Sequence, residues 1–164
     1  MMSDMKLFPE IESHSLLGEQ FDLPADFPAK RTVVIAAFLR EQQELVDRWI
    51  TALADAGVPE TPLGLDAGAE TVVLELPVLS KRYRMVRGRI DGTMRRAIKL
   101  EPILARTWTT YTDVEAFRKA LNIPTPRVEV MIVNRLGEVI DRASGEPSEI
   151  SVARIAAVAL NGAD

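Results

Sequence analysis

The sequence predicts an α/β protein in which helices flank a central mixed β-sheet, with an N-terminal β-hairpin or extended arm before it. Three observations predict this class. The apolar segment TVVIAAFL at residues 32–39 is typical of a strand buried on both faces. An amphipathic helical pattern follows it directly. Later, VEVMIVN and VIDRA flank the turn RLGE as an antiparallel hairpin, and a last helix follows.

The first half of the chain predicts an arm, a strand and a helix. Residues 8–31 are rich in Pro and Gly, and we expect them to form the arm, with a turn around Gly18. The strand at 32–39 leads into a helix that Gly57 and Pro59 end. Trp49 is predicted to be a core residue, because it lies on an apolar stripe with Leu45, Val46, Ile50 and Leu53.

The second half predicts two more strand–helix units, the hairpin and a last helix. A strand is expected at residues 71–76, with Pro77 as its end. A helical pattern covers residues 79–98 and places Tyr83 and Met94 towards the core. The remaining expected elements are a strand at 105–111, a helix capped by the TDVE sequence at 112–115, the hairpin, and a helix capped by Ser148 or Ser151.

Length and composition predict one soluble domain. The 164 residues can bury a substantial core, so we expect a single domain with residues 1–31 as the arm and 32–164 as the core. No apolar run approaches the roughly 18 residues of a membrane span. The first twelve residues have no apolar segment of the signal-peptide kind. We therefore expect a cytoplasmic protein, which a basic segment could make membrane-peripheral.

The sequence contains no cysteine and a single histidine, His14. The absence of cysteine excludes disulfides, thiol nucleophiles, thiolate metal ligands, and thiol oxidoreductase or peroxidase activity. One imidazole is too few for a zinc or iron site built on several histidines. A Ser-His-Asp triad would have to recruit His14 from the arm. We expect no catalytic residue, no metal and no cofactor, and these observations favour a non-enzymatic protein over an enzyme.

The order of these elements, with Pro126 just before the hairpin, resembles the thioredoxin-like fold. More narrowly it resembles the version with an N-terminal extension found in peroxiredoxins and thioredoxin-like reductases. The resemblance covers residues 16–160 and rests on LLGEQFDLPADF, VVIAAFLREQQ, TPRVEVMIV and VNRLGEVIDRASG. It implies that REQQ, residues 40–43, occupies the place of the cysteine-containing loop, and that Pro126 occupies the cis-proline position. Gln42 and Gln43 can form hydrogen bonds there but cannot form a thiolate.

A closer resemblance concerns FLREQQELVDRW, LELPVLSKRYRMVRGRIDGTMRRAI and VEVMIVNRLGEVIDRASG. These segments are similar to cysteine-free thioredoxin-like proteins related to the mitochondrial assembly factor of the F-type ATP synthase membrane sector. That resemblance implies a role in assisting a membrane complex rather than in electron transfer.

Residues 79–106 form an unusually basic segment. They contain nine Lys and Arg residues and two carboxylates, a local net charge of +7 in a chain of net charge −4. In a helix, Arg82, Arg89 and Arg96 would form one stripe, while Asp91 would lie four residues from both Arg87 and Arg95. Such a segment fits an acidic protein, an anionic lipid surface or this chain's own carboxylates. Nucleic acid is disfavoured, because aromatic residues make up only 5% of the chain.

Three functions remain open from the sequence. The first is a redox-inactive thioredoxin-like protein that binds or chaperones another polypeptide, either an acidic protein or a membrane-complex subunit. The second is a small-anion-binding protein or non-thiol enzyme with a pocket between the helix start and the basic segment. The third is a scaffold that forms a homodimer. The candidate binding residues are Arg40, Gln42, Gln43, Arg87, Asp91, Arg95, Thr125 and Pro126, and the alternative for the two glutamines is an ordinary solvated helical turn.

Overall fold

The computed structural model describes residues 6–59 and 70–161, and these residues contain one mixed β-sheet. Its strands are β1 (Ile11–Ser15), β2 (Gln20–Leu23), β3 (Arg31–Ala37), β4 (Thr71–Ser80), β5 (Trp108–Thr112), β6 (Glu129–Asn134) and β7 (Val139–Ser144). They lie in the order β2-β1-β5-β4-β3-β6-β7, and β3, β4 and β5 run parallel. The predicted α/β class with a mixed sheet is confirmed. Residues 1–5 of the expected arm, and residues 60–69 and 162–164 of the expected core, lie outside the described residues.

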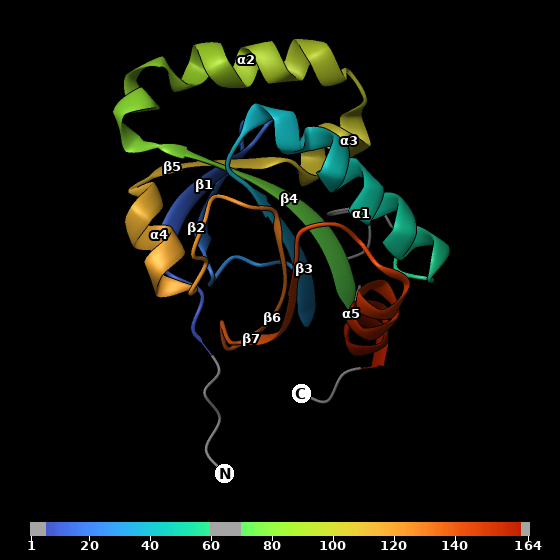
Figure 1. Ribbon diagram of the computed structural model, residues 1–164. Coiled ribbons are helices and arrows are strands. Elements are labelled where there is room, and N and C mark those ends of the chain that lie inside the picture. The colour runs from blue at the N-terminus through green and yellow to red at the C-terminus, as the bar shows by residue number, and fades with distance from the viewer. Residues whose placement is uncertain (1–5, 60–69, 162–164) are drawn as a thin grey trace.

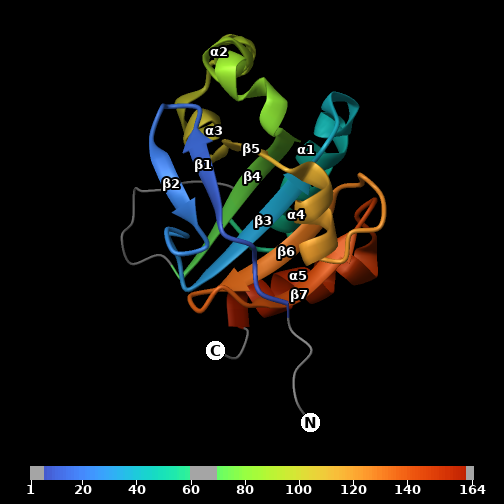
Figure 2. The same cartoon turned by 90° about the vertical axis from the view of Figure 1, so that its left-hand side faces the viewer.

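Helices cover both faces of this sheet and one end of its strands. They are η1 (Arg40–Gln42), α1 (Gln43–Asp55), η2 (Lys81–Val86), α2 (Arg87–Ile98), α3 (Glu101–Arg106), α4 (Val114–Ala120) and α5 (Glu149–Asn161), where η marks a 3-10 helix. α1 and α5 pack on one face and α4 on the other (Figures 1 and 2). α2 lies across the end of the sheet, at the top of both views. None of the helices described is long and apolar enough to cross a membrane.

β3 is the centre of the sheet and of the core. Its first six residues are buried, because α1 and α5 cover one face and α4 covers the other. Val33 and Ile35 face the side of Trp49, whose exposed fraction is 0%. Val34 and Ala36 face the side of α4. The continuous apolar pattern therefore predicted a doubly covered strand correctly, and Trp49 is a core residue as expected.

The predicted N-terminal hairpin is present and extends the sheet. β1 and β2 pair in antiparallel fashion from Ile11 with Leu23 to His14 with Gln20. Gly18 takes a φ of +95° in the turn, a conformation that residues with a Cβ rarely adopt. β1 also pairs with β5, so the arm is an edge of the same sheet.

The prediction that Pro77 ends the second strand is wrong. β4 continues through Pro77 to Ser80. Ala37 and Pro77 are the last partners between β3 and β4, and from Val78 onwards β4 pairs with β5 instead. Pro77 therefore sits where the pairing passes from one neighbour to the other, a position at which a missing N–H is tolerated.

The expected helix over residues 79–98 begins later than its pattern predicted. After β4 the chain forms η2, with the Ser80 hydroxyl accepting a hydrogen bond from the Arg82 amide, and the α-helix starts at Arg87. The stripe of Arg82, Arg89 and Arg96 is consequently not formed, because a 3-10 turn advances with a different period. Tyr83 is 39% exposed, so its prediction as a core residue is also wrong, whereas Met94 is partly buried.

Two further boundaries differ from expectation and one holds. The strand expected at 105–111 starts at Trp108, because α3 takes the preceding residues. The N-cap of α4 is Asp113 rather than Thr112, with the Asp113 carboxylate accepting from the Ala116 amide at 3.0 Å. Ser148 caps α5, since its hydroxyl accepts from the Ser151 amide at 3.0 Å.

Candidate functional site

The junction between β3 and α1 is held together by the side chain of Gln42. Its Oε1 accepts hydrogen bonds from the amides of Phe38 at 2.9 Å and Leu39 at 3.2 Å. Its Nε2 donates to the carbonyl oxygen of Pro126 at 2.7 Å. The amide thus joins the end of the central strand to the loop before β6. In this place Gln42 is a structural bridge rather than a free solvated side chain.

Gln43 connects the start of α1 to a buried ion pair beneath it. Its Nε2 donates to Asp47 at 2.9 Å and to Oε1 of Glu75 at 3.1 Å. Glu75 lies on β4 and is 3% exposed, and its Oε2 accepts from Nε of Arg106 at 3.0 Å. Sequence reasoning missed this pair. The available signal was a single carboxylate within the apolar strand sequence TVVLEL.

Around the Gln42–Pro126 bridge the surface is exposed. Arg40, Thr125 and Pro126 are exposed, and Leu39 is 45% exposed. The side chain of Arg40 has no hydrogen-bond or ion-pair partner within the described ranges. Of the described peptide bonds, only Leu23–Pro24 is cis, so the bond before Pro126 is trans. The resemblance implied a cis-proline position at Pro126, whereas the peptide bond before Pro126 is trans in the structure.

Asp91 anchors α2 to the sheet. Its carboxylate accepts hydrogen bonds from the hydroxyl of Thr109, at 3.1 and 3.0 Å to its two oxygens, and from that of Tyr111 at 2.7 Å. Nη1 of Arg87 lies 2.9 Å from Nε2 of His14 and 3.2 Å from Nδ1. Arg95 donates to the carbonyl oxygen of Leu16 at 3.5 Å. All three predicted residues of α2 thus contact β1, β5 or the chain next to them.

Burial sets the titration of the two aromatic groups in this cluster. It lowers the pKa of His14, and the neighbouring Arg87 guanidinium lowers that pKa further, while Glu12 and Asp91 act in the opposite direction. Burial, followed by the hydrogen bond to Asp91, raises the pKa of Tyr111 far above its ordinary value. Both groups are neutral at physiological pH, and the Tyr111 proton stays with the phenol as the donor to Asp91. This arrangement serves to anchor a helix rather than to transfer protons.

The structure does not bring the predicted residues into one pocket. Within residues 6–59 and 70–161, no hydrogen bond or ion pair joins the group at Arg40–Gln43 to the group at Arg87, Asp91 and Arg95. Arg87 is directed to His14 on β1, which two strands separate from β3. The expected ion pairs of Asp91 with Arg87 and Arg95 are also not formed in this part of the chain. The geometry weighs against the small-anion pocket.

The exposed cations of η2 and α2 are not neutralised by carboxylates of the described chain. In the described chain, the Arg side chains that form ion pairs with carboxylates all lie outside η2 and α2. Arg84 donates to the carbonyl of Tyr111, and Arg82 lies over the ring of Tyr83, with 5.1 Å to the centroid. The sequence left open that this chain's own carboxylates pair with the basic segment. Within the described chain, the residues of η2 and α2 form no such ion pairs.

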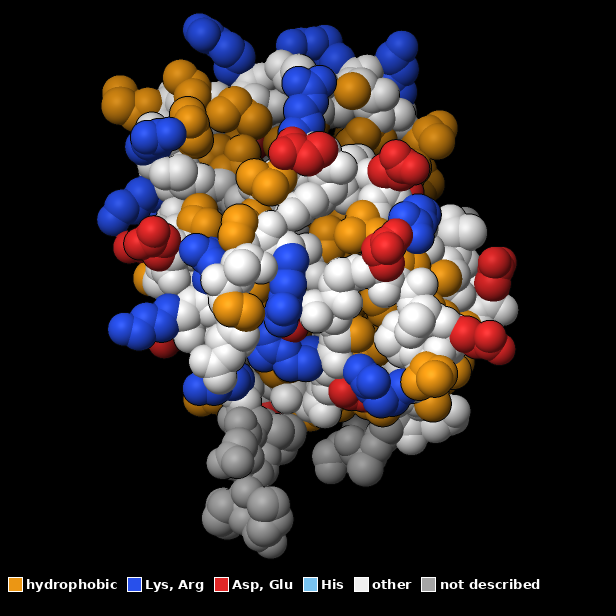
Figure 3. All heavy atoms as spheres, viewed as in Figure 1, with side chains coloured by type: hydrophobic (Ala, Val, Ile, Leu, Met, Phe, Trp, Pro, Cys, Tyr) orange, Lys and Arg blue, Asp and Glu red, His pale blue; other side chains and the backbone are white. Residues whose placement is uncertain are grey.

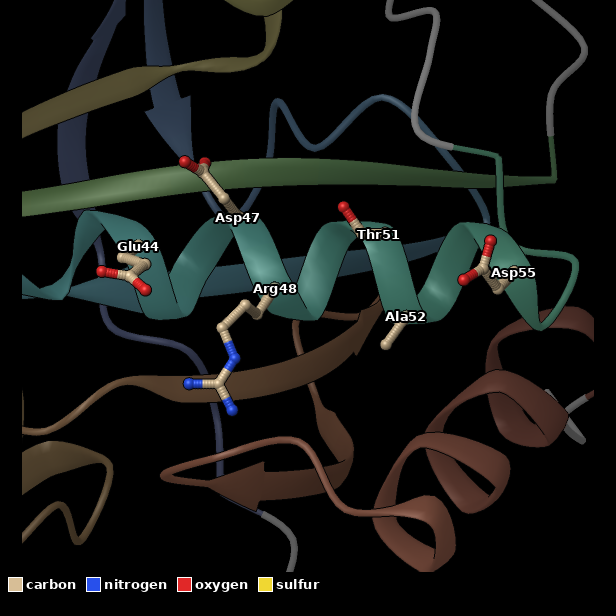
Figure 4. A pocket seen from close by; sticks show the side chains of 6 residues that line it. All are labelled: Glu44, Asp47, Arg48, Thr51, Ala52 and Asp55. Atoms are coloured by element: carbon tan, nitrogen blue, oxygen red, sulfur yellow. The ribbon is translucent and has the colours of Figure 1, made fainter.

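The surface of α1 has a shallow depression, but its side chains do not converge. It is lined by Glu44, Asp47, Arg48, Thr51, Ala52 and Asp55. Figure 4 shows that these side chains leave the helix in different directions, with Arg48 directed away from Asp47 and Thr51. In the described ranges, no group of three or more His, Asp or Glu side chains is placed to hold a metal ion.

Comparison with known proteins gives the fold. No family model and no curated protein sequence matches the chain. Among solved structures it is similar to the exposed lipoprotein thioredoxin Etrx1 of Streptococcus pneumoniae strain TIGR4, with a TM-score of 0.56 and 9% identity, over 90% of this chain and 98% of that one. It is also similar to BsSco, a member of the Sco family of cytochrome c oxidase assembly proteins, with a TM-score of 0.59 and 6% identity over 98% and 97%.

A third similarity is to the mitochondrial 2-Cys peroxiredoxin of Plasmodium falciparum, with a TM-score of 0.53 and 11% identity over 99% of both chains. The chain therefore has a thioredoxin-like fold. Thioredoxins and 2-Cys peroxiredoxins work through cysteines, and this chain contains none. The sequence thus combines a thioredoxin-like fold with the absence of cysteine.

Proposed function

We propose that this chain is a redox-inactive thioredoxin-like protein that binds another polypeptide and assists the assembly of a larger complex. The observation that carries the proposal is the side chain of Gln42. At the place of the redox loop it forms three hydrogen bonds that fix the loop geometry, and it leaves Arg40, Thr125 and Pro126 exposed around it. A rigid, exposed surface without reactive groups is suited to recognition rather than to catalysis.

The shape and chemistry of this surface indicate what a partner would contact. Leu39 offers an apolar contact and Arg40 a cation with no partner in the described chain, while Thr125 and Pro126 are exposed beside the Gln42 bridge. A partner segment with an acidic residue next to an apolar one would match both groups. We refer to Leu39, Arg40, Thr125 and Pro126 as the junction surface.

Two similarities support an assembly role. BsSco belongs to a family of assembly proteins and has the same fold. The cysteine-free relatives of the ATP synthase assembly factor resemble this chain in the segments that contain the junction and the basic helix. A subunit of a membrane complex is therefore the partner we propose, with the protein acting from the cytoplasmic side.

Site-specific photo-crosslinking in cells tests this proposal. A photoreactive amino acid is placed at Arg40, at Thr125 or, as the control, at Arg135, an exposed cation on the turn between β6 and β7. We expect Arg40 and Thr125 to give the same crosslinked partner and Arg135 to give none. Equal crosslinking from all three positions, or a different set of proteins from Arg40 and Thr125, would contradict a defined junction surface.

A further inference from the structure

We propose that the edge of the molecule formed by η2 and α2 binds anionic lipid headgroups and holds the protein against a membrane surface. This inference concerns a second surface and does not depend on the function proposed for the junction surface. The basic edge is defined by exposed cations and by exposed apolar side chains at both ends of α2. The cations are Lys81, Arg82, Arg89, Arg96 and Lys99, and the most exposed apolar side chains are Met85 and Leu100.

The charge of the basic edge is unopposed on its outer side. The five cations form no ion pair with any carboxylate in residues 6–59 and 70–161. Asp91 is the one acidic residue between positions 81 and 99, and it faces inward, where the hydroxyls of Thr109 and Tyr111 bind it. Like charges gathered on one face repel each other, and an external anionic surface relieves that repulsion.

Exposed apolar side chains lie just before α2 and just after it. Met85 is 99% exposed, and Tyr83 and Val86 beside it are 39% and 38% exposed. Leu100, which follows the other end of α2, is 61% exposed. The 12 residues of α2 span about 18 Å between these ends. Exposed apolar groups beside cations are the composition of helices that lie in the interface of a membrane.

The position of α2 in the fold allows approach to a flat surface. The helix lies along one edge of the molecule, beyond the end of the sheet, in both ribbon views (Figures 1 and 2). At that edge, the top of Figure 3, Lys and Arg side chains project outward and hydrophobic side chains lie between and beside them. A bilayer could contact the whole length of this edge without meeting the α4 or α5 side of the protein.

The separation of the apolar groups favours lipid over an acidic polypeptide. An acidic segment would neutralise the cations but would leave both Met85 and Leu100 in water, unless it also carried apolar residues at matching distances. An anionic bilayer presents headgroup charge everywhere and an apolar layer just beneath it. The bilayer therefore satisfies both ends and the middle of the basic edge at the same time.

Vesicle sedimentation with the full chain tests the charge requirement. We expect binding to vesicles that contain phosphatidylglycerol, little binding to phosphatidylcholine alone, and release as salt is added. The variant R89E/R96E should bind at least tenfold more weakly. The variant K119E/R135E makes the same change in net charge at two exposed cations away from this edge and should bind like the wild type.

Fluorescence tests whether Met85 enters the interface. The native Trp49 and Trp108 are both 0% exposed, so M85W adds a reporter against a constant background. Its emission should shift to the blue when phosphatidylglycerol vesicles are added. L136W, at another apolar position that is 78% exposed, should not respond. Because Met85 is almost fully exposed, this substitution leaves the core intact, and a cooperative unfolding curve verifies each variant.

Three results would overturn the proposal. One is equal binding to both kinds of vesicle, and another is unchanged binding by R89E/R96E. The third is saturable binding of a polyglutamate peptide by a protein that ignores the vesicles, which would assign the basic edge to an acidic polypeptide. Failure here leaves crosslinking from Arg40 and Thr125 unaffected, so the two proposals are tested separately.

Discussion

At the scale of single residues, two carboxylates are buried in the described part of the chain. Glu75 is 3% exposed and lies in an ion pair with Arg106. Glu129 is 1% exposed, and its two oxygens accept from Arg127 at 3.2 Å and Arg142 at 2.7 Å. They lie on β4 and β6, the two neighbours of β3. Buried charges need a partner, so these Arg side chains make the burial of Glu75 and Glu129 possible.

Replacing Glu75 should destabilise the fold more than replacing the whole pair. E75Q removes the negative charge that pairs with Arg106 at 3.0 Å, which we expect to lower the free energy of unfolding by about 3 kcal/mol. The double variant E75L/R106M removes both charges at similar volume and should be less destabilised than E75Q. Urea unfolding of the wild type, E75L, R106M and E75L/R106M gives the coupling energy of the pair. Additive effects of the two substitutions would show that the pair is not coupled.

Gln42 should stabilise the junction between β3 and α1 locally. Q42A removes two acceptor bonds and one donor bond, and each net contribution is about 0.5–1.5 kcal/mol. We expect faster amide hydrogen exchange at Phe38 and Leu39 and a smaller change in the distant strand β7. Q42E keeps the acceptor but loses the donor to Pro126, so it should retain protection at Phe38 and Leu39. Equal loss in Q42A and Q42E would contradict the separate roles of the two amide atoms.

At the scale of secondary structure, periodicity predicted which elements exist and tertiary contacts set where they end. The apolar run of β3 and the stripe of α1 were predictable because each residue's burial follows its own sequence period. The prediction for Pro77 was wrong because a strand tolerates proline only where its neighbours do not need the missing N–H. Which strands are neighbours depends on contacts distant in sequence. The same holds for Glu75 and Arg106, which are 31 positions apart. Gln42 and Pro126 were both predicted as site residues, yet their hydrogen bond required the fold.

The attachment of α2 should weaken in mild acid through His14. Burial and Arg87 lower the pKa of His14 below 6.5, and Glu12 and Asp91, the carboxylates near it, only partly offset this. The unfolded state therefore accepts a proton that the folded state resists. The stabilisation is fully present above pH 6.5, the unfolded value, and is lost as pH falls from there towards the lower folded pKa.

A comparison of the wild type with H14N measures this contribution. The free energy of unfolding of the wild type should fall between neutral pH and about pH 5, before most carboxylates titrate, and that of H14N should fall less. NMR titration of the single imidazole should give a midpoint below that of an unfolded peptide. Parallel pH profiles for the two proteins would contradict the role assigned to His14.

At the scale of the whole molecule, the charges are segregated although the chain as a whole is acidic. The net charge is −4 and the isoelectric point is about 5.2, yet residues 79–106 carry +7. The fold gathers most of that positive charge on one edge, since Asp91 is turned inward and Arg106 is buried against Glu75. The remaining surface is correspondingly negative. Such a molecule has an uneven electrostatic surface potential, so its net charge is a poor guide to what it binds.

Ion-exchange chromatography at neutral pH should reveal this segregation without any partner. A protein of net charge −4 with evenly distributed charges would pass through a cation exchanger. We expect the wild type to be retained at low salt and to elute as the Debye length falls to about 10 Å near 0.1 M salt, since the attraction acts through solvent. R89E/R96E should flow through, whereas K119E/R135E, with the same net charge, should still be retained. If both variants behave alike, net charge rather than the basic edge governs the interaction, and the outward cations of α2 do not act as one surface.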